Sequence, residues 1–324
     1  MPLRIGLTIG DVTGIGPEIA LKAVAAEPAP DDTCYRFIGD STRLRLLNET
    51  LKLGLPLGSE RLALHDTGNA LPAQLDSGAP EAARAAVHWL GLAADMCLAR
   101  ELDAVVTAPV NKEAIVRAGI PFVGQTEFFS ERAKADRTVM MLLGHDERGR
   151  WLRVALATVH LALREVPVKL TAGKIQLAIE RAAEACRDLG LSRARVAVCG
   201  LNPHCGEGGE FGDDEPRIVE PAIAAMRQRG FDVAGPISGD TAFHHSLHGE
   251  FDAVVAMYHD QGLAPLKTVA FDTGVNWTLG LPFIRTSPDH GTAYNIAGQG
   301  IANPSSMISA IRLAKQLARA KARG

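Results

Sequence analysis

Residues 4–27 read RIGLTIGDVTGIGPEIALKAVAAE, an apolar run of strand character, a glycine-rich turn and then a helical pattern with proline in its first turn. Similar strand-like runs recur at 34–39, 103–109, 138–144, 152–159, 195–200 and 252–258, and long helical patterns at 79–101, 169–190 and 304–322. This alternation predicts α/β layers around a largely parallel sheet. A chain of 324 residues is long enough for two such domains.

The composition excludes several classes of protein. A hydrophobic fraction of 47% and a charged fraction of 22% are typical of globular proteins, and a net charge of -3 provides no basic surface for nucleic acid. The five cysteines form no CxxC pair, which favours reduced thiols, and no apolar run approaches the roughly 18 residues that span a bilayer. We therefore expect a cytoplasmic protein that binds neither nucleic acid nor membrane.

Three histidines occupy the polar tails of strand-like runs: His160 in ATVHLA, His204 in LNPHCGEGG and His259 in MYHDQG. In open α/β sheets, ligands bind beyond the carboxyl ends of the strands, so these tails are expected to converge. Imidazole is the commonest metal ligand, and three protein ligands leave a catalytic ion one open position. The pattern therefore suggests a divalent-metal site, with the alternative that each ring only bonds to nearby backbone.

Two glycine-rich segments need separate interpretations. In GDVTGIGPEI (10–19), Ile19 stands where GxGxxG requires glycine and no GK[ST] follows, so we expect a tight turn before a helix, with or without a bound anion. In NPHCGEGGEFGDDE (202–215), we interpret the glycines as a flexible path that carries His204 to a metal. Cys205 is interpreted as a small packed side chain, and the acids that end the segment are expected to start the next helix.

Further polar residues lie in a segment near the C-terminus that is rich in turn-forming residues. Lys267, Asn276 and Arg285 are expected on loops, where they suit a phosphate or carboxylate, or else form ordinary solvated contacts. Asp240 and Asp260 could support metal-bound histidines or cap helices.

The chain resembles the 4-hydroxythreonine-4-phosphate dehydrogenase family of pyridoxal phosphate biosynthesis. The resemblance runs in order from about residue 4 to 306, through GDVTGIGPEI, TAPVNKEAI, GQTEF, NPHCGEGGEFGDDE, GDTAF, YHDQGLAPLK, GVNWTLGLPFIRTSPDHGTA and IAGQG. A second resemblance links DHGTAYNIAGQGIANPSSMI to the loop that grips the adenosine end of the dinucleotide in isopropylmalate dehydrogenases.

These resemblances imply an isocitrate/isopropylmalate dehydrogenase-like α/β fold, with two α/β domains flanking an active-site cleft. Residues 1–125 plus 280–324 would form the domain with the dinucleotide loop, and 126–279 the domain with most metal and substrate ligands. The implied protein is a homodimer with its active site at the interface. It would oxidise 4-phosphooxy-L-threonine with NAD or NADP to 2-amino-3-oxo-4-phosphooxybutanoate, which decarboxylates to 3-amino-2-oxopropyl phosphate on the way to pyridoxine 5'-phosphate.

The family's site residues carry over by position. One divalent ion (zinc, cobalt or magnesium) would be held by His160, His204 and His259. The implied substrate ligands are Gln125, Thr126, Lys267, Asn276 and Arg285, and the implied cofactor contacts are His290, Gly291, Thr292, Ala293 and Asn295. The general base stays open among Asp240, Asp260 and a metal-bound water, with Lys267 a further candidate.

Four departures from the family pattern matter. Gln125 replaces the usual histidine, and an amide cannot shuttle a proton or carry charge at neutral pH. Asn295 replaces the aspartate that favours NAD by repelling a 2′-phosphate, so selectivity against NADP is expected to be weak. Val12 with Thr13 in place of Pro-Ala, and Cys205 in place of alanine, are expected to change only local packing.

Three rival functions remain. A sibling dehydrogenase would act on 4-phospho-threonate or 4-phospho-erythronate, which differ from 4-phosphooxy-threonine at its amino group. A metal-dependent acyl or phosphoryl transferase would leave the DHGTAYNIAG loop without a role. A structural-metal protein would need a fourth ligand, and none is evident beside the three histidines.

Overall fold

The computed structural model describes residues 2–27, 32–66, 68 and 71–323, and the chain divides into two compact units. Unit 1 is Met1–Asp136 with Leu281–Gly324, and unit 2 is Arg137–Gly280. Helix α5 (Gln125–Arg132) therefore belongs to unit 1, whereas the sequence placed almost all of it in the second domain. The physical reason is packing, because the ring of Phe129 in α5 meets that of Phe283 edge-on at 6.1 Å.

The strands of unit 1 are all parallel and lie in the order β3-β2-β1-β4-β11. Their bounds are β1 Leu3–Thr8, β2 Thr33–Ile38, β3 Leu62–His65, β4 Ala104–Thr107 and β11 Ile284–Pro288. The chain runs outward from β1 through β2 to β3 and then crosses to β4 on the other side of β1. A switch of this kind opens a space beyond the carboxyl ends of β1 and β4, where ligands bind in doubly wound sheets.

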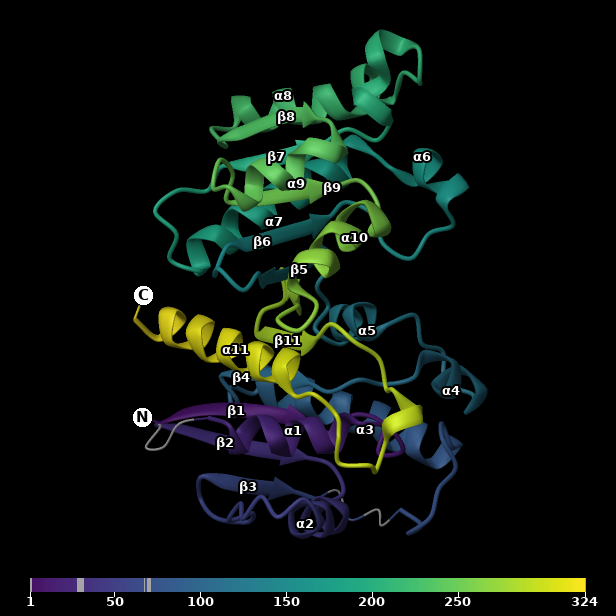
Figure 1. Cartoon of the computed structure of the whole chain (residues 1–324), viewed down its shortest axis with the longest axis vertical. Helices are drawn as coiled ribbons and strands as arrows, with labels where there is room; N and C mark the ends of the chain where they lie inside the picture. Colours follow the sequence, from purple (N-terminus) through teal and green to yellow (C-terminus); the bar gives the residue numbers. More distant parts are fainter. Residues whose placement is uncertain (1, 28–31, 67, 69–70, 324) are drawn as a thin grey trace. The chain divides into compact units, whose positions relative to one another are not determined.

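Two groups of helices cover this sheet. Their bounds are α1 Gly16–Ala25, α2 Ser41–Thr50, α3 Pro80–Leu98, α4 Lys112–Arg117, η4 Tyr294–Ile296 and α11 Ser305–Arg323, together with α5. Helix α11 packs on α1, β1, β4 and β11, and Figure 1 shows it in yellow beside these strands. Helix α3 packs on β1 and β4, and helices α4 and α5 pack against α3. Side-chain caps fix two of the helix starts, with Asp40 accepting from Arg43 N and Asn111 from Ala114 N.

The strands of unit 2 lie in the order β10-β5-β6-β9-β7-β8. Their bounds are β5 Val139–His145, β6 Trp151–Leu156, β7 Val196–Cys199, β8 Val233–Ile237, β9 Ala253–Ala256 and β10 Val275–Leu279. Strand β5 is antiparallel to β10 and β6, whereas the β6-β9, β9-β7 and β7-β8 pairs are parallel. The carboxyl ends of β6, β9 and β7 therefore lie side by side at one edge.

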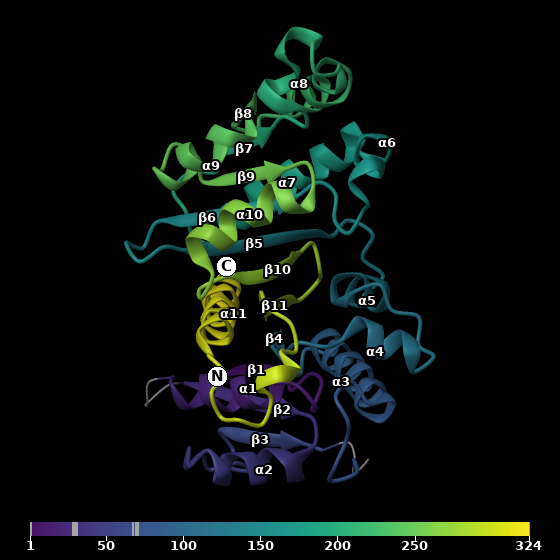
Figure 2. The same cartoon turned by 45° about the vertical axis from the view of Figure 1, so that its right-hand side comes forward.

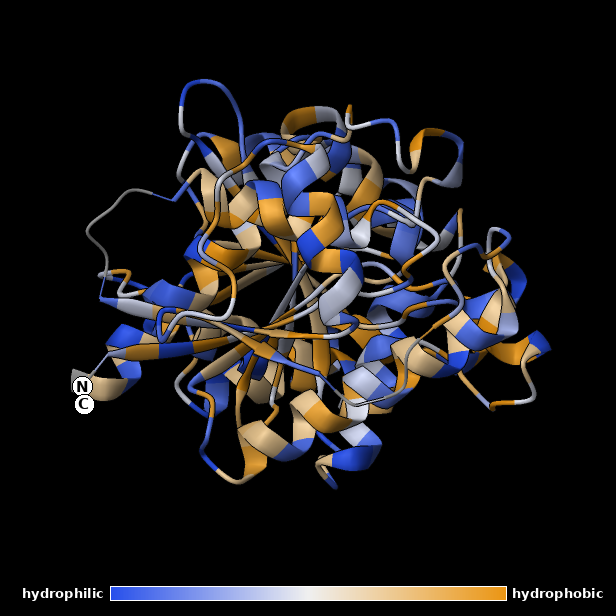
Figure 3. Cartoon of the chain, turned by 90° about the horizontal axis from the view of Figure 1, so that it is seen from below, coloured by the Kyte–Doolittle hydropathy of each residue, from blue (hydrophilic) through white to orange (hydrophobic). Residues whose placement is uncertain are grey.

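The helices of unit 2 are η1 Leu163–Glu165, α6 Val166–Lys169, α7 Ala172–Asp188, η2 Pro203–Gly209, η3 Glu215–Val219, α8 Glu220–Gln228, α9 Gly239–Leu247 and α10 His259–Ala270. Helices α9 and α10 both pack on β6 and β9, and Figure 2 shows α10 in front of β5 and β6. Helix α7 packs on β6 and β9 with α8 beside it. The strands are mostly apolar, as the orange ribbons of Figure 3 show, whereas the helices mix both colours. Within the described residues, none of the helices is both long and apolar enough to cross a membrane.

The strand and helix runs named from the sequence are confirmed, but the turn-rich segment near the C-terminus was misread. Lys267 lies in α10, Asn276 in β10 and Arg285 in β11, so these residues are on regular elements and not on loops. Strands β10 and β11 are only five residues long and are flanked by glycines and prolines, so the sequence shows no clear strand pattern there. Both strands are defined by distant partners, since β10 pairs with β5 and β11 with β4.

Candidate active site

The loops that follow β6 and β9 are joined at the carboxyl edge of unit 2. Ala157 N donates to Ala256 O at 2.9 Å, and the buried hydroxyl of Thr158 donates to Met257 O at 2.6 Å. These bonds bring together the two histidines that follow, and the ring centroids of His160 and His259 lie 5.6 Å apart. His160 has φ 37°, a left-handed backbone that is uncommon for a residue with a side chain.

The orientation of His259 is set by its neighbour in the sequence. Nδ1 of His259 lies 2.7 Å from Oδ1 of Asp260 at the start of α10. A carboxylate on one ring nitrogen fixes the tautomer and leaves Nε2 as the ligating atom. Asp260 lies in the first turn of α10 and its side chain is 86% exposed, whereas the N-cap is Tyr258, which has no side-chain cap bond.

His204 is held by an unusual backbone turn. Five consecutive residues from His204 to Gly208 have positive φ, three of them without the freedom of glycine. The buried carboxylate of Glu215 accepts from the backbone N–H groups of Leu201 and Asn202 at 2.8 and 2.7 Å and from the amide of Asn202 at 3.1 Å. Glu215 thus begins η3, as expected of the acids that end this segment, and it also ties down the turn that carries His204.

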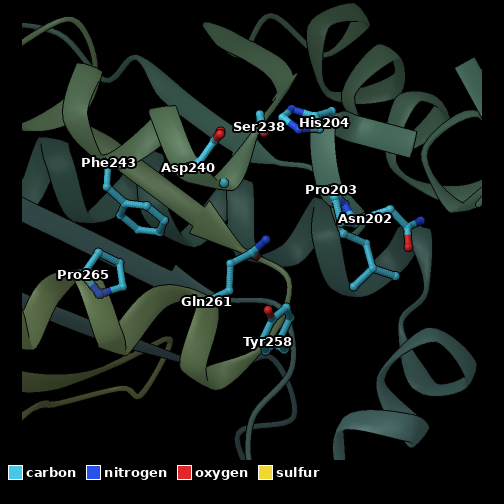
Figure 4. A pocket seen from close by; sticks show the side chains of 11 residues that line it. Asn202, Pro203, His204, Ser238, Asp240, Phe243, Tyr258, Gln261 and Pro265 are labelled. Atoms are coloured by element: carbon cyan, nitrogen blue, oxygen red, sulfur yellow. The ribbon is translucent and has the colours of Figure 1, made fainter. Parts of the chain in front are cut away.

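A cavity of about 520 Å³ opens beside His204, lined also by Ser238, Asp240, Phe243, Tyr258 and Gln261. Figure 4 shows His204 next to Ser238 and Asp240, with Gln261 pointing in from α10. Gln261 connects two strand ends, because Nε2 donates to Gly200 O at 2.7 Å and Oε1 accepts from Met257 N at 2.7 Å. A hydrogen bond from Ser238 holds the pKa of Asp240 below its usual range, so this carboxylate is ionised at neutral pH.

The imidazole groups suit a divalent ion chemically, since they stand at adjacent strand ends and one is already oriented by a carboxylate. Among residues 2–27, 32–66, 68 and 71–323, however, no three His, Cys, Asp or Glu side chains are gathered closely enough to hold a metal. The structure pairs His160 with His259 and places His204 on the cavity wall. Burial raises the pKa of the Cys205 thiol, which disfavours the thiolate that a metal would need.

In unit 1, Arg285 is buried, and its guanidinium donates to the side-chain oxygens of Thr107 and Gln125. Nε and Nη2 donate to Thr107 Oγ1 at 3.1 and 2.8 Å, and Nη2 donates to Gln125 Oε1 at 2.9 Å. Burial lowers the pKa of Arg285 to about 9, while Glu127 acts in the opposite direction, so the group stays charged at neutral pH. The guanidinium carbon lies 5.6 Å from the centre of the Phe129 ring, which adds a cation–π contact.

The start of α5 lies beside this guanidinium. Gly124 precedes α5 and provides no side-chain cap, and the buried Thr126 is in the first turn. A helix N-terminus and a buried arginine both favour an anion at the same place. Of the other expected substrate ligands, Lys267 is half-buried on α10, and Asn276 has a buried Oδ1 without a hydrogen-bond partner in the described part of the chain.

The segment that resembles a dinucleotide loop lies against the β1–α1 turn of unit 1. Ile15 N donates to Thr292 O at 2.9 Å, and a Cβ on Gly14 would lie 2.6 Å from the same oxygen. Ala293 has φ 44°, Gly291 and Asn295 are exposed, and Nε2 of His290 is buried with no partner among the described residues. The five expected cofactor residues thus lie within one short segment beside this turn, and the ring nitrogen of His290 that lacks a partner among the described residues suits a polar ligand.

Several residues that build these sites were not found from the sequence. Asp11 accepts from the Tyr294 hydroxyl at 2.6 Å, and Glu18 accepts from Ala302 N at 2.9 Å, so the β1–α1 turn and the first turn of α1 each hold one part of the loop. Thr107, Glu215 and Gln261 act in the same supporting way. The only sequence signal of Thr107 was its position at the end of strand β4, which many structural residues share.

The strand orders and parallel pairings define an α/β protein of the isocitrate dehydrogenase-like class. Isocitrate dehydrogenase from Methylococcus capsulatus superposes with a TM-score of 0.50 at 16% identity, covering 98% of this chain and 88% of that chain, a likeness in fold alone. Within that class, the chain belongs to the family described as pyridoxal phosphate biosynthetic protein PdxA, which it matches over residues 37–314. The resemblance inferred from the sequence motifs is confirmed at this level.

Individual relatives agree with this assignment. The 4-hydroxythreonine-4-phosphate dehydrogenase of Geobacter metallireducens is 44% identical over 337 residues, covering 99% of this chain and 97% of that protein. The crystal structure of the Klebsiella pneumoniae enzyme of the same name has a TM-score of 0.82 at 38% identity, covering 98% and 99%. A terephthalate 1,2-cis-dihydrodiol dehydrogenase from Burkholderia xenovorans is also similar, at 30% identity and a TM-score of 0.66 over 97% and 98% of the chains.

Proposed function

We propose that this protein oxidises the secondary alcohol of 4-phosphooxy-L-threonine with NAD or NADP, and that the β-keto acid formed then loses carbon dioxide to give 3-amino-2-oxopropyl phosphate. Full-length relatives carry the name 4-hydroxythreonine-4-phosphate dehydrogenase, which supports the oxidation step of this proposal. We also propose that it works in the cytoplasm as a homodimer, and the five unpaired cysteines are compatible with a reducing compartment.

The single observation that best supports a phosphorylated substrate is the buried guanidinium of Arg285. The guanidinium donates hydrogen bonds to Thr107 and Gln125, and Glu127 lies near enough to act on its pKa. A guanidinium binds phosphate oxygens through charge-assisted hydrogen bonds, and a helix start also favours an anion, so a phosphate next to Arg285 and the start of α5 would be stabilised by both. The resemblance adds Thr126, Lys267 and Asn276 as further substrate ligands.

The proposed chemistry depends on groups that the protein would bind. A divalent ion on His160, His204 and His259 would supply Lewis acidity toward the substrate hydroxyl and the later ketone, and NAD or NADP would accept the hydride. Binding energy at the phosphate would be used to orient the reacting carbon of the substrate. The 290–295 segment would hold the adenosine end of the cofactor.

We place the acceptor of the hydroxyl proton at Asp240. Asp240 lines the cavity together with His204 and is ionised at neutral pH, whereas Asp260 is bonded to His259 and mostly exposed. A carboxylate with a lowered pKa is a weak base, so it can accept this proton only from a hydroxyl that has been made more acidic. Lys267 is assigned to the phosphate, because a protonated ammonium donates and does not accept.

The proposal is tested by following nicotinamide reduction in purified protein. Both 4-phosphooxy-L-threonine and 4-phospho-threonate are offered with NAD and with NADP, before and after removal of divalent ions, and after addition of zinc, cobalt or magnesium. We expect reduction with the amino substrate that is lost on metal removal and restored by one of these ions. His259→Ala should abolish it, while His248→Ala, an exposed histidine on the same unit, should not.

Each part of the proposal can fail separately. Faster turnover of 4-phospho-threonate would make the chain a sibling dehydrogenase. Full activity after metal removal would contradict the role of the three histidines. Absence of nicotinamide reduction with both substrates under every metal condition would contradict the dehydrogenase assignment itself.

A further inference from the structure

The side chain of Gln125 connects Arg285 to the end of β4. Its Oε1 accepts from Arg285 Nη2 at 2.9 Å, and its Nε2 donates to Ala108 O at 3.3 Å. Thr107, the residue before Ala108, accepts from Nε and Nη2 of the same guanidinium. Two adjacent residues at the end of β4 and one glutamine therefore determine how the arginine is oriented.

The direction of the Gln125 amide follows from its partners. A guanidinium can only donate hydrogen bonds, so it requires the amide oxygen, and a backbone carbonyl can only accept, so it requires the amide nitrogen. Reversing the amide would set donor against donor and acceptor against acceptor. Gln125 is thus in a single orientation, with one acceptor and one donor each matched to a group of the fold.

We propose that Gln125 is a positioning residue, which acts on the substrate phosphate through the orientation of Arg285 and not as a phosphate ligand itself. The inference rests on the proposed function, in which Arg285 binds that phosphate. A planar guanidinium binds a phosphate well only when its plane and edge are correctly directed, so a residue that fixes the plane contributes to affinity without touching the ligand. This assigns Gln125 a role different from the one expected from family resemblance.

The chemistry of this position also explains why glutamine can stand where related proteins have histidine. A neutral imidazole provides one acceptor and one donor, as the amide does, but an imidazolium has two donors and no acceptor. Protonation would therefore remove the acceptor for Arg285 and add a positive charge beside it. Arg285 on β11 and Glu127 on α5 are charged groups near this position in the described structure. The Gln125 amide does not titrate, so its hydrogen bonds to its neighbours do not change with pH.

A double-mutant cycle provides the main test. The dissociation constant for inorganic phosphate is measured by calorimetry, and KM and kcat for 4-phosphooxy-L-threonine by nicotinamide reduction, in the wild type, Gln125→Met, Arg285→Lys and the double variant. Gln125→Met should raise the phosphate dissociation constant and KM about tenfold, in line with a lost hydrogen bond to a charged group, and change kcat less than about threefold. The same change in the Arg285→Lys protein should have an effect under about threefold, because a flexible ammonium has no plane to orient.

Gln228→Met is the matched control, since Gln228 is exposed on α8. It should leave all three constants unchanged. An effect of Gln125→Met that persists undiminished in the Arg285→Lys protein would show direct phosphate contact and would overturn the proposal. Equal affinity of wild type and Gln125→Met for phosphate would also overturn it, while absence of phosphate binding to the wild type would count against the proposed function instead.

Gln125→His gives an independent answer if the methionine variant folds poorly. Comparing its phosphate dissociation constant with that of the wild type at each pH cancels the titration of phosphate itself. The proposal predicts a variant-to-wild-type ratio that is larger at pH 6 than at pH 8, because an imidazole with an ordinary pKa of about 6.5 loses its acceptor on protonation. A direct ligand would give the opposite trend, since an imidazolium attracts phosphate more strongly than a neutral ring.

Discussion

The hydroxyl of Tyr294 donates to Oδ2 of Asp11 at 2.6 Å, and this bond joins two turns that are 283 residues apart in the sequence. Asp11 is buried, and its other oxygen accepts from the backbone and side chain of Thr13 at 2.9 and 2.7 Å. The carboxylate thus connects the turn after β1 with the segment proposed to hold the cofactor. The turn and the segment should therefore move, or loosen, together.

Removal of this hydroxyl should weaken cofactor binding more than catalysis. We expect Tyr294→Phe to lower the free energy of unfolding by about 1.5–3 kcal/mol, the usual range for a hydrogen bond to a charged group. KM for NAD or NADP should rise several-fold while KM for the phosphorylated substrate stays near its wild-type value. An unchanged cofactor KM in a destabilised variant would mean that the bond serves the fold alone.

The hydrogen bond between Tyr294 and Asp11 should also affect how the free energy of unfolding changes at high pH. Burial, together with the hydrogen bond to Asp11, raises the pKa of Tyr294 to about 12, above the ordinary value of 10.0 in the unfolded chain. Below pH 10 the Tyr294 hydroxyl is protonated in both the folded and the unfolded protein. Between pH 10 and 12 the unfolded chain releases this proton more readily than the folded protein, so the free energy of unfolding should fall as pH rises through this range. Denaturant unfolding at pH 9 and pH 11 should show a smaller loss for Tyr294→Phe than for the wild type. Equal losses in the two proteins would contradict the raised pKa.

Asp260 should affect metal binding without being a ligand. Asp260→Asn keeps the shape of the side chain but weakens its bond to Nδ1 of His259, and changes of this kind usually cost about 10–100-fold in metal affinity. Titration of metal-free protein with zinc or cobalt provides the measurement. Asp76→Asn, an exposed aspartate of unit 1, is the control. Identical affinities in the Asp260 variant and the wild type would separate this carboxylate from the metal.

The buried carboxylate of Glu215 should be essential for the turn that carries His204. Glu215→Gln retains the shape but replaces one acceptor oxygen with a donor, which opposes the amide of Asn202. We expect a loss of about 1–3 kcal/mol in the free energy of unfolding and faster hydrogen exchange at residues 200–212. Glu220→Gln, exposed on α8, should change neither quantity. Wild-type exchange rates in the Glu215 variant would show that the turn holds its shape without this carboxylate.

The cofactor preference should be adjustable at Asn295, which is exposed in η4. Asn295→Asp restores a negative charge where related loops have one, and like charges should disfavour the 2′-phosphate of NADP. We expect kcat/KM for NADP to fall about tenfold or more relative to that for NAD. The ratio of the two values in wild type and variant is the measurement. A preference that does not change would place the 2′-position of the ribose elsewhere.

The sequence indicated the candidate sites more securely than it indicated how they are supported. The strand ends that carry His160, His204 and His259 were recognisable because a buried parallel strand is a short apolar run and its polar tail is abrupt. The strand containing Arg285 was read as loop, since five residues between turns carry little periodic signal. Its burial could not be foreseen either, because an arginine becomes a buried group only when Thr107, Gln125 and Phe129 surround it.

The sequence by itself determined the α/β class and the family, because strand and helix periodicity and the ordered motif blocks are local properties of the chain. The tertiary structure alone decided the side-chain partners: Gln125 with Arg285, Asp11 with Tyr294, and Glu215 with the turn of His204. It also decided that α5 belongs to unit 1. These outcomes depend on contacts between residues far apart in the sequence, which form only when strands such as β4 and β11 pair, and no local pattern records such a pairing.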